Sequence, residues 1–350
     1  MASKNSFVLG FVVIFVLSTG LYLSQTSQFQ EQEPSGIGDD SGSLTLSESS
    51  YVTGDSTDQY LENMMSGGPP QDGIPSVDDP EFMDADEADL DPGDKVVGIV
   101  KDGEARAYPQ DILVHHEIVN DDINGEKVAI TYCPLTATSQ GFKTGDTTLG
   151  VSGQLVNSNL VLYDRETESY FSQIASTGIK GEYKDETLDE VNLIWTTWEN
   201  WKEQNPDTQV LTRETGYFRN YDRDPYGDYN PRDGYYADDG TIFSLMHEAE
   251  DHHEKEMVLG ARTSEETVYV TMEDLESEKV LGTENFVAVY DDRYDTGYIY
   301  SGQHSIERTE EGYMYEGEVY EPDNLPLDKQ VSVEAFYFAW NSFYPESETY

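Results

Sequence analysis

The stretch LGVSGQLVNSNLVLY, residues 149–163, indicates the fold class, because it contains two short runs rich in residues that favour β-strands. The two runs are 149–156 and 159–163. Similar runs, each bounded by turn residues, recur at 95–101, 127–133, 257–261, 286–290 and 297–300. Their number and short length predict a domain that is mainly β.

Two short helices are expected among these strands, at 110–119 and 198–204. The second begins with Thr196 as its N-cap and has Glu199 three residues later, which is the pattern of a capping box. Trp198 and Trp201 then lie on one face of this helix, and we expect them to pack against the sheet as core rather than form a ligand cage. The fold class predicted is α+β, a β-rich single globular domain. No internal repeat of fixed period is evident.

The N-terminal part of the chain has a different composition. Residues 7–23 form an uncharged apolar run of 17 residues behind Lys4, near the lower limit for a helix that spans a bilayer. We expect residues 1–24 to be an uncleaved signal-anchor, with a cleaved signal peptide as the alternative. Residues 25–69 are expected to form an acidic, flexible, low-complexity linker. The globular domain, residues 70–350, would then lie outside the cell membrane, with a weak subdivision after about residue 233.

The charge of the chain is strongly negative. Asp and Glu number 70 against 20 Lys and Arg, which gives a formal net charge of -50. At molar salt the Debye length falls to about 3 Å, so such a surface no longer repels itself. This composition predicts a protein of a halophile. It also excludes nucleic acid as a partner, because affinity for phosphate backbones comes mostly from Lys and Arg.

Six segments are distinctive when taken together. They are DGIPSVDDPEF at 72–82, HHEIVND at 115–121, TYCPLTAT at 131–138, VSGQLVNSNLVLYDRETESYFSQ at 151–173, WKEQNPDTQVL at 201–211 and NYDRDPYGDYNPR at 220–232. In order and density they resemble the family called domain of unknown function 3179, and its salt-loving archaeal members above all, over about residues 70–350. The resemblance implies no reaction, because the family's name assigns none.

This chain departs from the family pattern at two positions. The family often reads C-P-L-C where this sequence has Cys133, Pro134, Leu135 and Thr136, so the resemblance implies neither a redox dithiol nor a two-thiolate metal site here. The family also commonly has Trp where His115 stands. The following residues, His116 and Glu117, are therefore the better candidates in that segment.

His116, Glu117 and Cys133 are the residue types of a thiol nucleophile with a histidine base and a carboxylate that orients it. The alternative is a buried thiol and a histidine bonded to the backbone. His116 and Cys133, with Glu117, are also ligand types for a divalent transition metal, which is the cofactor that the sequence leaves open. Asp164 and Arg165 follow a strand and would either place charge in a cleft or form a structural ion pair.

A second metal hypothesis concerns the loop at 222–233. Oxygen-bearing residues stand at loop positions one, three, seven, nine and twelve, with Gly227 at six, as in an imperfect calcium loop. They are Asp222, Asp224, Asp228, Asn230 and Asp233. Such spacing also arises by chance in a chain this acidic, and Arg223 and Arg232 are expected to pair locally.

Two classes of function follow from the sequence. The first is an extracytoplasmic enzyme or metal protein with a pocket around His116, Cys133, Asp164 and Arg165, acting on a small-molecule substrate. The second is a non-catalytic surface module that binds a cell-envelope partner or glycan through its many tyrosines, which number 25.

Overall fold

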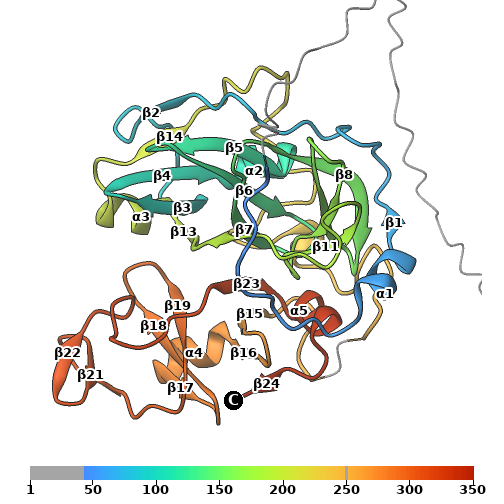
Figure 1. Cartoon of the computed structure of the whole chain (residues 1–350). Helices are drawn as coiled ribbons and strands as arrows, with labels where there is room; N and C mark the ends of the chain where they lie inside the picture. The colour runs from blue at the N-terminus through green and yellow to red at the C-terminus, as the bar shows by residue number, and fades with distance from the viewer. Residues whose placement is uncertain (1–42, 249–250) are drawn as a thin grey trace, which may run out of the picture. The chain divides into compact units, whose positions relative to one another are not determined.

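The strands expected from the sequence are present, and they form six sheets in the described part of the chain (Figure 1). The computed structural model describes residues 43–248 and 251–350. Three sheets come from its first part. Their strand orders are β1-β8-β9-β10-β11, β12-β7-β6-β5 and β13-β3-β4-β14-β2. The strands are β1 (Met65–Ser66), β2 (Phe82–Asp84), β3 (Lys95–Lys101), β4 (Glu104–Pro109), β5 (Ile118–Ile123), β6 (Glu126–Cys133), β7 (Thr138–Lys143), β8 (Leu149–Val156), β9 (Asn159–Asp164), β10 (Tyr170–Ser172), β11 (Thr177–Lys180), β12 (Glu190–Val191), β13 (Ile194–Thr197) and β14 (Gln209–Leu211).

The other three sheets come from the C-terminal part, coloured orange to red in Figure 1. Their orders are β23-β15-β16-β24, β17-β18-β19 and β20-β21-β22. The strands are β15 (Met257–Arg262), β16 (Thr267–Thr271), β17 (Val280–Gly282), β18 (Phe286–Asp291), β19 (Thr296–Ser301), β20 (Glu307–Arg308), β21 (Tyr313–Tyr315), β22 (Glu318–Tyr320), β23 (Ser332–Phe336) and β24 (Glu348–Thr349). The predicted β-rich α+β class is confirmed.

The helices are short. They are α1 (Thr57–Glu62), α2 (Gln110–His116), α3 (Trp198–Gln204), α4 (Met272–Glu278), α5 (Tyr337–Phe343) and the 3₁₀ turn Gly234–Tyr236. The helix expected to run to residue 119 ends earlier, because Glu117 adopts a left-handed backbone with φ 59° and Ile118 begins β5. The N-cap of α3 is Thr197, whose side chain accepts from the Asn200 backbone, so the prediction of Thr196 was wrong by one residue.

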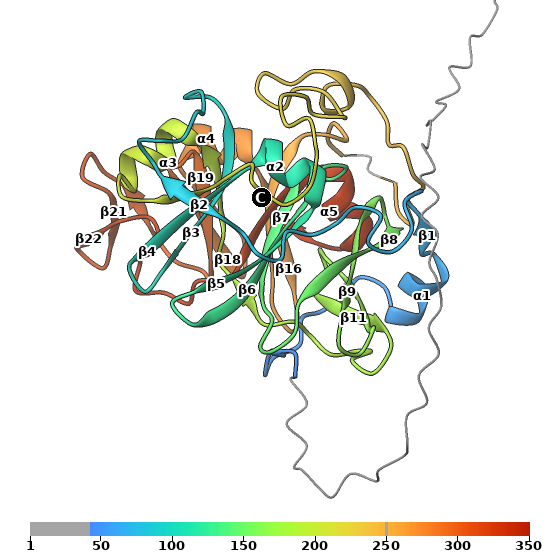
Figure 2. The same ribbon diagram turned by 90° about the horizontal axis from the view of Figure 1, so that it is seen from above.

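The region expected to be a flexible linker is ordered from residue 43 onward. Leu44 and Tyr60 are buried in the core, and Ser56 and Gln59 form a capping box that begins α1. Figure 2 shows α1 and β1 at one edge of the molecule beside β8 and β11, where β1 pairs with β8. The few apolar residues of this acidic stretch are therefore enough to attach it to the sheet. The expected signal-anchor, 1–24, lies outside the described residues, and no helix within them has the length and apolarity needed to cross a bilayer.

Two parts of the chain repeat one arrangement of strands and helices. The first repeat comprises residues 95–143 and 194–211, and the second comprises 257–301 and 332–349. Each repeat begins with two antiparallel strands, β3 and β4 or β15 and β16, which are followed by a helix and three further strands. It ends with a strand, a helix and a strand, β13-α3-β14 or β23-α5-β24, and these two strands join the sheet of the first two. The last strand runs parallel to its neighbour in both cases, β14 beside β4 and β24 beside β16. Each repeat is interrupted at the same place by an inserted sheet, β8 to β11 in the first and β20 to β22 in the second.

The register of the strands agrees between the repeats. Gly98 of β3 pairs with Ala107, and Gly260 of β15 pairs with Tyr269, each nine residues further along. On their other side these glycines pair with Ile194 of β13 and with the equivalent residue of β23. The sequences of the repeats share few residues, which explains why no periodicity is visible in the chain. The repeat is a property of the backbone pairing.

The helix that ends each repeat places a tryptophan over the equivalent glycine. A Cβ atom on Gly98 would lie 2.2 Å from the ring of Trp201, and one on Gly260 would lie 2.5 Å from the ring of Trp340. Each indole donates at 3.0 Å to a hydroxyl seven residues later in the chain. Trp201 and Trp340 are fully buried, so the predicted core role of Trp201 is confirmed.

The repeats are joined by reciprocal contacts and not by the chain alone. The backbone NH of Phe336 in the second repeat donates to the carbonyl of Thr136 in the first, at 2.9 Å. In the other direction, the hydroxyl of Thr196 donates to the carbonyl of Tyr294 at 2.5 Å. One core cluster contains side chains of both repeats, and the chain from Gly42 onward is one compact unit. We call the boundary between the repeats the seam.

Candidate functional site

His116 is held as a neutral, structural side chain. Its Nδ1 donates to the carbonyl of Pro75 at 2.8 Å, and its Nε2 accepts from the hydroxyl of Tyr221 at 2.7 Å. Burial lowers the pKa of His116 to about 4. Because both ring nitrogens already have partners, the imidazole is not placed as a base for Cys133.

Cys133 lies at the end of β6 and is 2% exposed. Its Sγ lies 3.8 Å from the carbonyl of Ser158. Burial, together with the charge of Glu117, raises the pKa of the thiol to about 11. Burial also raises the pKa of Glu117 to about 8. The structure thus brings Glu117 and Cys133 together without His116, and a thiol in these surroundings is inert at neutral pH.

Asp164 and Arg165 hold the fold together. Asp164 is fully buried and accepts from the hydroxyl of Thr147 at 2.6 Å and from the turn that follows it. Arg165 forms ion pairs with Asp78 at 2.6 Å and with Asp72 at 3.0 Å. Arg165 thus forms structural ion pairs, whereas Asp164 is held by hydroxyl and backbone donors and pairs with no cation among the described residues.

The loop at 222–233 does not converge on a cation site. Asp222 pairs with Arg213, Asp224 accepts from Gln110, and Asp233 accepts from the backbone of the next residue. Across residues 43–248 and 251–350, no group of three or more His, Cys, Asp and Glu side chains is placed to hold a metal ion. That holds for the proposed His116 and Cys133 site as well as for the calcium pattern.

The segments that carry the family resemblance meet around residues 72–78. Pro75 receives the His116 bond, and Asp78 receives both Arg165 and the side-chain amide of Asn120. The family model described as "Protein of unknown function (DUF3179)" matches residues 71–347. The chain belongs to the DUF3179 family. Comparisons with curated proteins and with solved structures gave no match.

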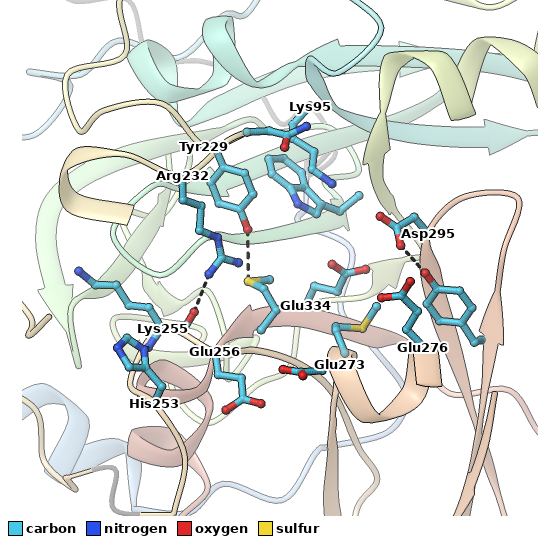
Figure 3. A pocket seen from close by; sticks show the side chains of 15 residues that line it. Lys95, Tyr229, Arg232, His253, Lys255, Glu256, Glu273, Glu276, Asp295 and Glu334 are labelled. Carbon is cyan, nitrogen blue, oxygen red and sulfur yellow. Dashed lines mark hydrogen bonds between the residues drawn. The ribbon is translucent and has the colours of Figure 1, made fainter. Parts of the chain in front are cut away.

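In this DUF3179 protein, a cavity of about 580 Å³ lies at the seam (Figure 3). We call it the seam pocket. Its walls come from three parts of the chain. Lys95 and Trp195 belong to the first repeat, and Glu334 belongs to the second. Tyr229 and Arg232 belong to residues 212–256, which join the two repeats and which we call the connecting segment. Assembly of the pocket therefore depends on the way the two repeats pack.

Three cations that line the seam pocket, Lys95, Arg232 and Lys255, form no ion pair with a carboxylate of the described residues. Most Lys and Arg side chains of the described chain form ion pairs, whereas Lys95 and Arg232 form none. Arg232 is positioned by a 2.8 Å bond from its Nη1 to the carbonyl of Lys255 and by the rings of Tyr229 and Phe336, each 5.3 Å away. The expectation that Arg232 pairs locally with an acid was wrong. Its guanidinium instead lies against aromatic rings.

Lys95 and Lys255 differ in what their ammonium groups can do. The Nζ of Lys95 lies 6.0 Å from the ring of Trp195, and burial lowers its pKa. The Nζ of Lys255 instead donates to the carbonyls of Tyr235 and Asp238 and, in Figure 3, points away from the cavity. Lys255 thus holds together two parts of the connecting segment, whereas Lys95 faces the pocket.

Carboxylates also line the seam pocket. Figure 3 shows Glu334 in the middle, with Asp295 and Glu276 on the side away from Arg232. Glu334 accepts from the hydroxyl of Thr296 at 2.5 Å, and burial raises its pKa to about 7, against the opposing effect of Lys95. Asp295 accepts from the hydroxyl of Tyr290. A cavity with perturbed titratable groups of both signs is a candidate binding or active site.

The repeat explains why the pocket forms beside the second repeat. At the corresponding place in the first repeat, Gln110 begins α2 and donates to Asp224 at 2.8 Å and to Tyr236 at 3.4 Å. Those two residues belong to the connecting segment, which fills much of that space and leaves a cavity of about 230 Å³. At the beginning of α4, the residues of the connecting segment leave more space, and the cavity there is the larger of the two.

The scarcity of cations is the signal that could have found this site from the sequence. It drew attention to Arg165, which proves structural, but the same reasoning applies to Lys95 and Arg232. They lie 137 positions apart, and nothing in the sequence shows that they face one cavity. Glu334 lies in a run whose pairing with β15 is visible only in the fold.

Proposed function

We propose that this protein is a membrane-anchored, extracytoplasmic binding protein of a halophile that takes a small solute carrying an anionic group into the seam pocket. The observation that carries the proposal is the pair Lys95 and Arg232, which face one cavity without carboxylate partners. In a chain with 70 acidic and 20 basic residues, cations would be expected to find acids easily. Lys95 is half-buried and Arg232 is exposed, and an anion that enters the cavity would supply the ion-pair partner that neither has among the described residues.

The size and lining of the cavity fit a small ligand. Its volume of about 580 Å³ lies within the usual range for ligand sites, roughly 300–1,000 Å³. The planar guanidinium of Arg232, which lines the cavity, is suited to a planar carboxylate. Trp195 and Tyr229 supply aromatic walls. We therefore favour a small ligand in this pocket over a glycan bound by surface tyrosines, because charged groups of both signs line the cavity.

Location outside the cell rests on the N-terminal sequence. The apolar run at 7–23 supports a single membrane anchor, and the acidic surface supports life in concentrated salt. The full chain, expressed in a salt-loving host, should sediment with membranes and be cut by protease added to intact cells. A chain shortened to residues 43–350 should stay in the soluble fraction. Soluble full-length protein would contradict the anchor.

Binding is best tested by titration calorimetry at constant molar salt. The probes are acetate, succinate and inorganic phosphate, with fluorescence of Trp195 as a second readout. Lys95→Gln and Arg232→Gln should each weaken binding by about tenfold or more, since a bond to a charged group contributes about 1.5–3 kcal/mol. Lys101→Gln, on the same strand, is the matched control, and thermal melting checks that each variant is folded. Equal affinity in wild type and both variants would reject the proposal, as would absence of binding by all three probes.

A second candidate function is acid–base catalysis in the same pocket. It is favoured by one observation, that burial sets the pKa of Glu334 to about 7 next to Lys95. A general acid or base works best with a pKa near the working pH. A ligand that binds should then be converted slowly, as followed by NMR, and Glu334→Gln should bind it without conversion. Unchanged ligand with the wild-type protein would leave binding as the function.

A further inference from the structure

We infer that the ligand of the seam pocket is a zwitterion, with its carboxylate held by Lys95 and Arg232 and its ammonium group held by the carboxylates opposite. This inference rests on the proposed function, because it assumes that the pocket binds a solute with an anionic group. It adds the second charge of the ligand and the side chains that recognise it.

The first support is the separation of charge across the cavity. Figure 3 shows Arg232 on one side and Asp295 and Glu276 on the other, with Lys95 and Glu334 between them. The cations come from the first repeat and the connecting segment, whereas these acids come from the second repeat. Glu256 of the connecting segment also lines the cavity, so that segment supplies both signs, whereas the second repeat supplies only acids.

The second support is the energetic cost of a ligand with one charge only. A simple anion would leave Glu334 and Glu276 without a cationic partner in the ligand, because its far end carries no charge. A simple cation would meet the same difficulty at Arg232. A molecule with both charges places each beside its opposite. The acids alone would carry little weight in so acidic a chain, but they share the cavity with Lys95 and Arg232, which form no ion pair among the described residues.

The third support is the uncharged part of the lining. Trp195, Tyr229 and Tyr290 line the cavity together with Met257 and Met272. Aromatic faces attract ammonium groups, and methionine side chains pack well against short methylene chains. The lining thus fits a compact ligand whose carboxylate and ammonium are separated by a few carbon atoms.

The test compares ligands that differ only in charge. Glycine, β-alanine, 4-aminobutyrate and 6-aminohexanoate form a length series of zwitterions. Each has a matched carboxylate, from acetate to hexanoate, and a matched alkylamine. Titrations at the same molar salt should show one length at which the zwitterion binds at least about tenfold more tightly than both matched compounds, the difference expected from one additional charged contact.

Two variants of α4 locate the ammonium site. Glu276→Gln, on the cavity side, should weaken binding of the best zwitterion about tenfold and leave binding of its matched carboxylate unchanged. Glu278→Gln removes the same charge from an exposed residue of the same helix that does not line the cavity, and should change neither. Both substitutions replace exposed side chains, so folding is preserved.

The outcomes separate this inference from the proposed function. If carboxylates bind as tightly as zwitterions at every length, the zwitterion is rejected and anion binding stands. If none of the compounds binds, both are rejected. If the zwitterion is preferred but Glu276→Gln behaves like Glu278→Gln, the assignment of the ammonium to this wall is overturned.

Discussion

Replacing Gly260 by alanine should destabilise the protein through a single new methyl group. The added Cβ would lie 2.5 Å from the ring of Trp340, whereas carbon atoms in contact are normally separated by about 3.5–4.0 Å. The indole would have to move by roughly 1 Å in a close-packed core, and overpacking of this kind costs about 1–3 kcal/mol. Gly98→Ala should lower the free energy of unfolding by a similar amount, because the ring of Trp201 lies over Gly98 in the same way.

The measurement is urea unfolding at constant molar KCl, followed by tryptophan fluorescence and circular dichroism. Gly282→Ala is the control, since a Cβ there meets no atom within 4 Å. The cause is tested by a double-mutant cycle with Trp340→Leu, in which the cost of Gly260→Ala should nearly vanish. The reasoning is refuted if Gly260→Ala is as stable as wild type, or if its cost is the same with and without the indole. A large difference between Gly98→Ala and Gly260→Ala would argue against equivalent repeats.

Three further predictions concern buried polar groups. Glu117 has a pKa of about 8 in the fold against 4.5 as its reference, so the wild type should lose stability as pH rises from 4.5 to 8. Glu117→Gln should remove that loss and be more stable by roughly 3 kcal/mol at pH 7 but not below pH 4.5, as unfolding at several pH values will show. Cys133 should resist iodoacetamide at pH 8 in the native state and react once urea unfolds the chain; rapid native alkylation would contradict its burial. Glu190→Gln should cost about 3–5 kcal/mol because it leaves Arg262, which is fully buried, without its ion-pair partner, whereas replacing both by Met should cost much less.

The local elements were predictable because short-range patterns determine them. The runs at 95–101 and 149–156 become β3 and β8 with the expected limits, and 198–204 becomes α3. The predictions were wrong at helix ends, where the conformation of a single residue decides the boundary. Glu117 ends α2 in a conformation that glycine usually provides, and the cap of α3 moved from Thr196 to Thr197.

The candidate site was largely not predictable. His116, Cys133, Asp164 and Arg165 stand out by residue type, yet each is satisfied within the fold by neighbours such as Pro75 and Asp78. Chemical type alone does not distinguish a buried, bonded side chain from one that faces a cavity. That distinction depends on long-range packing.

The sequence by itself determined the family, the β-rich class, the acidic character and the limits of many strands. These follow from composition and from patterns within about ten residues. Only the tertiary structure decided that the chain contains a repeat, that residues 43–69 belong to the folded body, and that Lys95, Arg232 and Glu334 share one cavity. The physical reason is that strand pairing and the packing of one repeat on the other join residues more than a hundred positions apart, and burial and charge at the seam exist only after that packing.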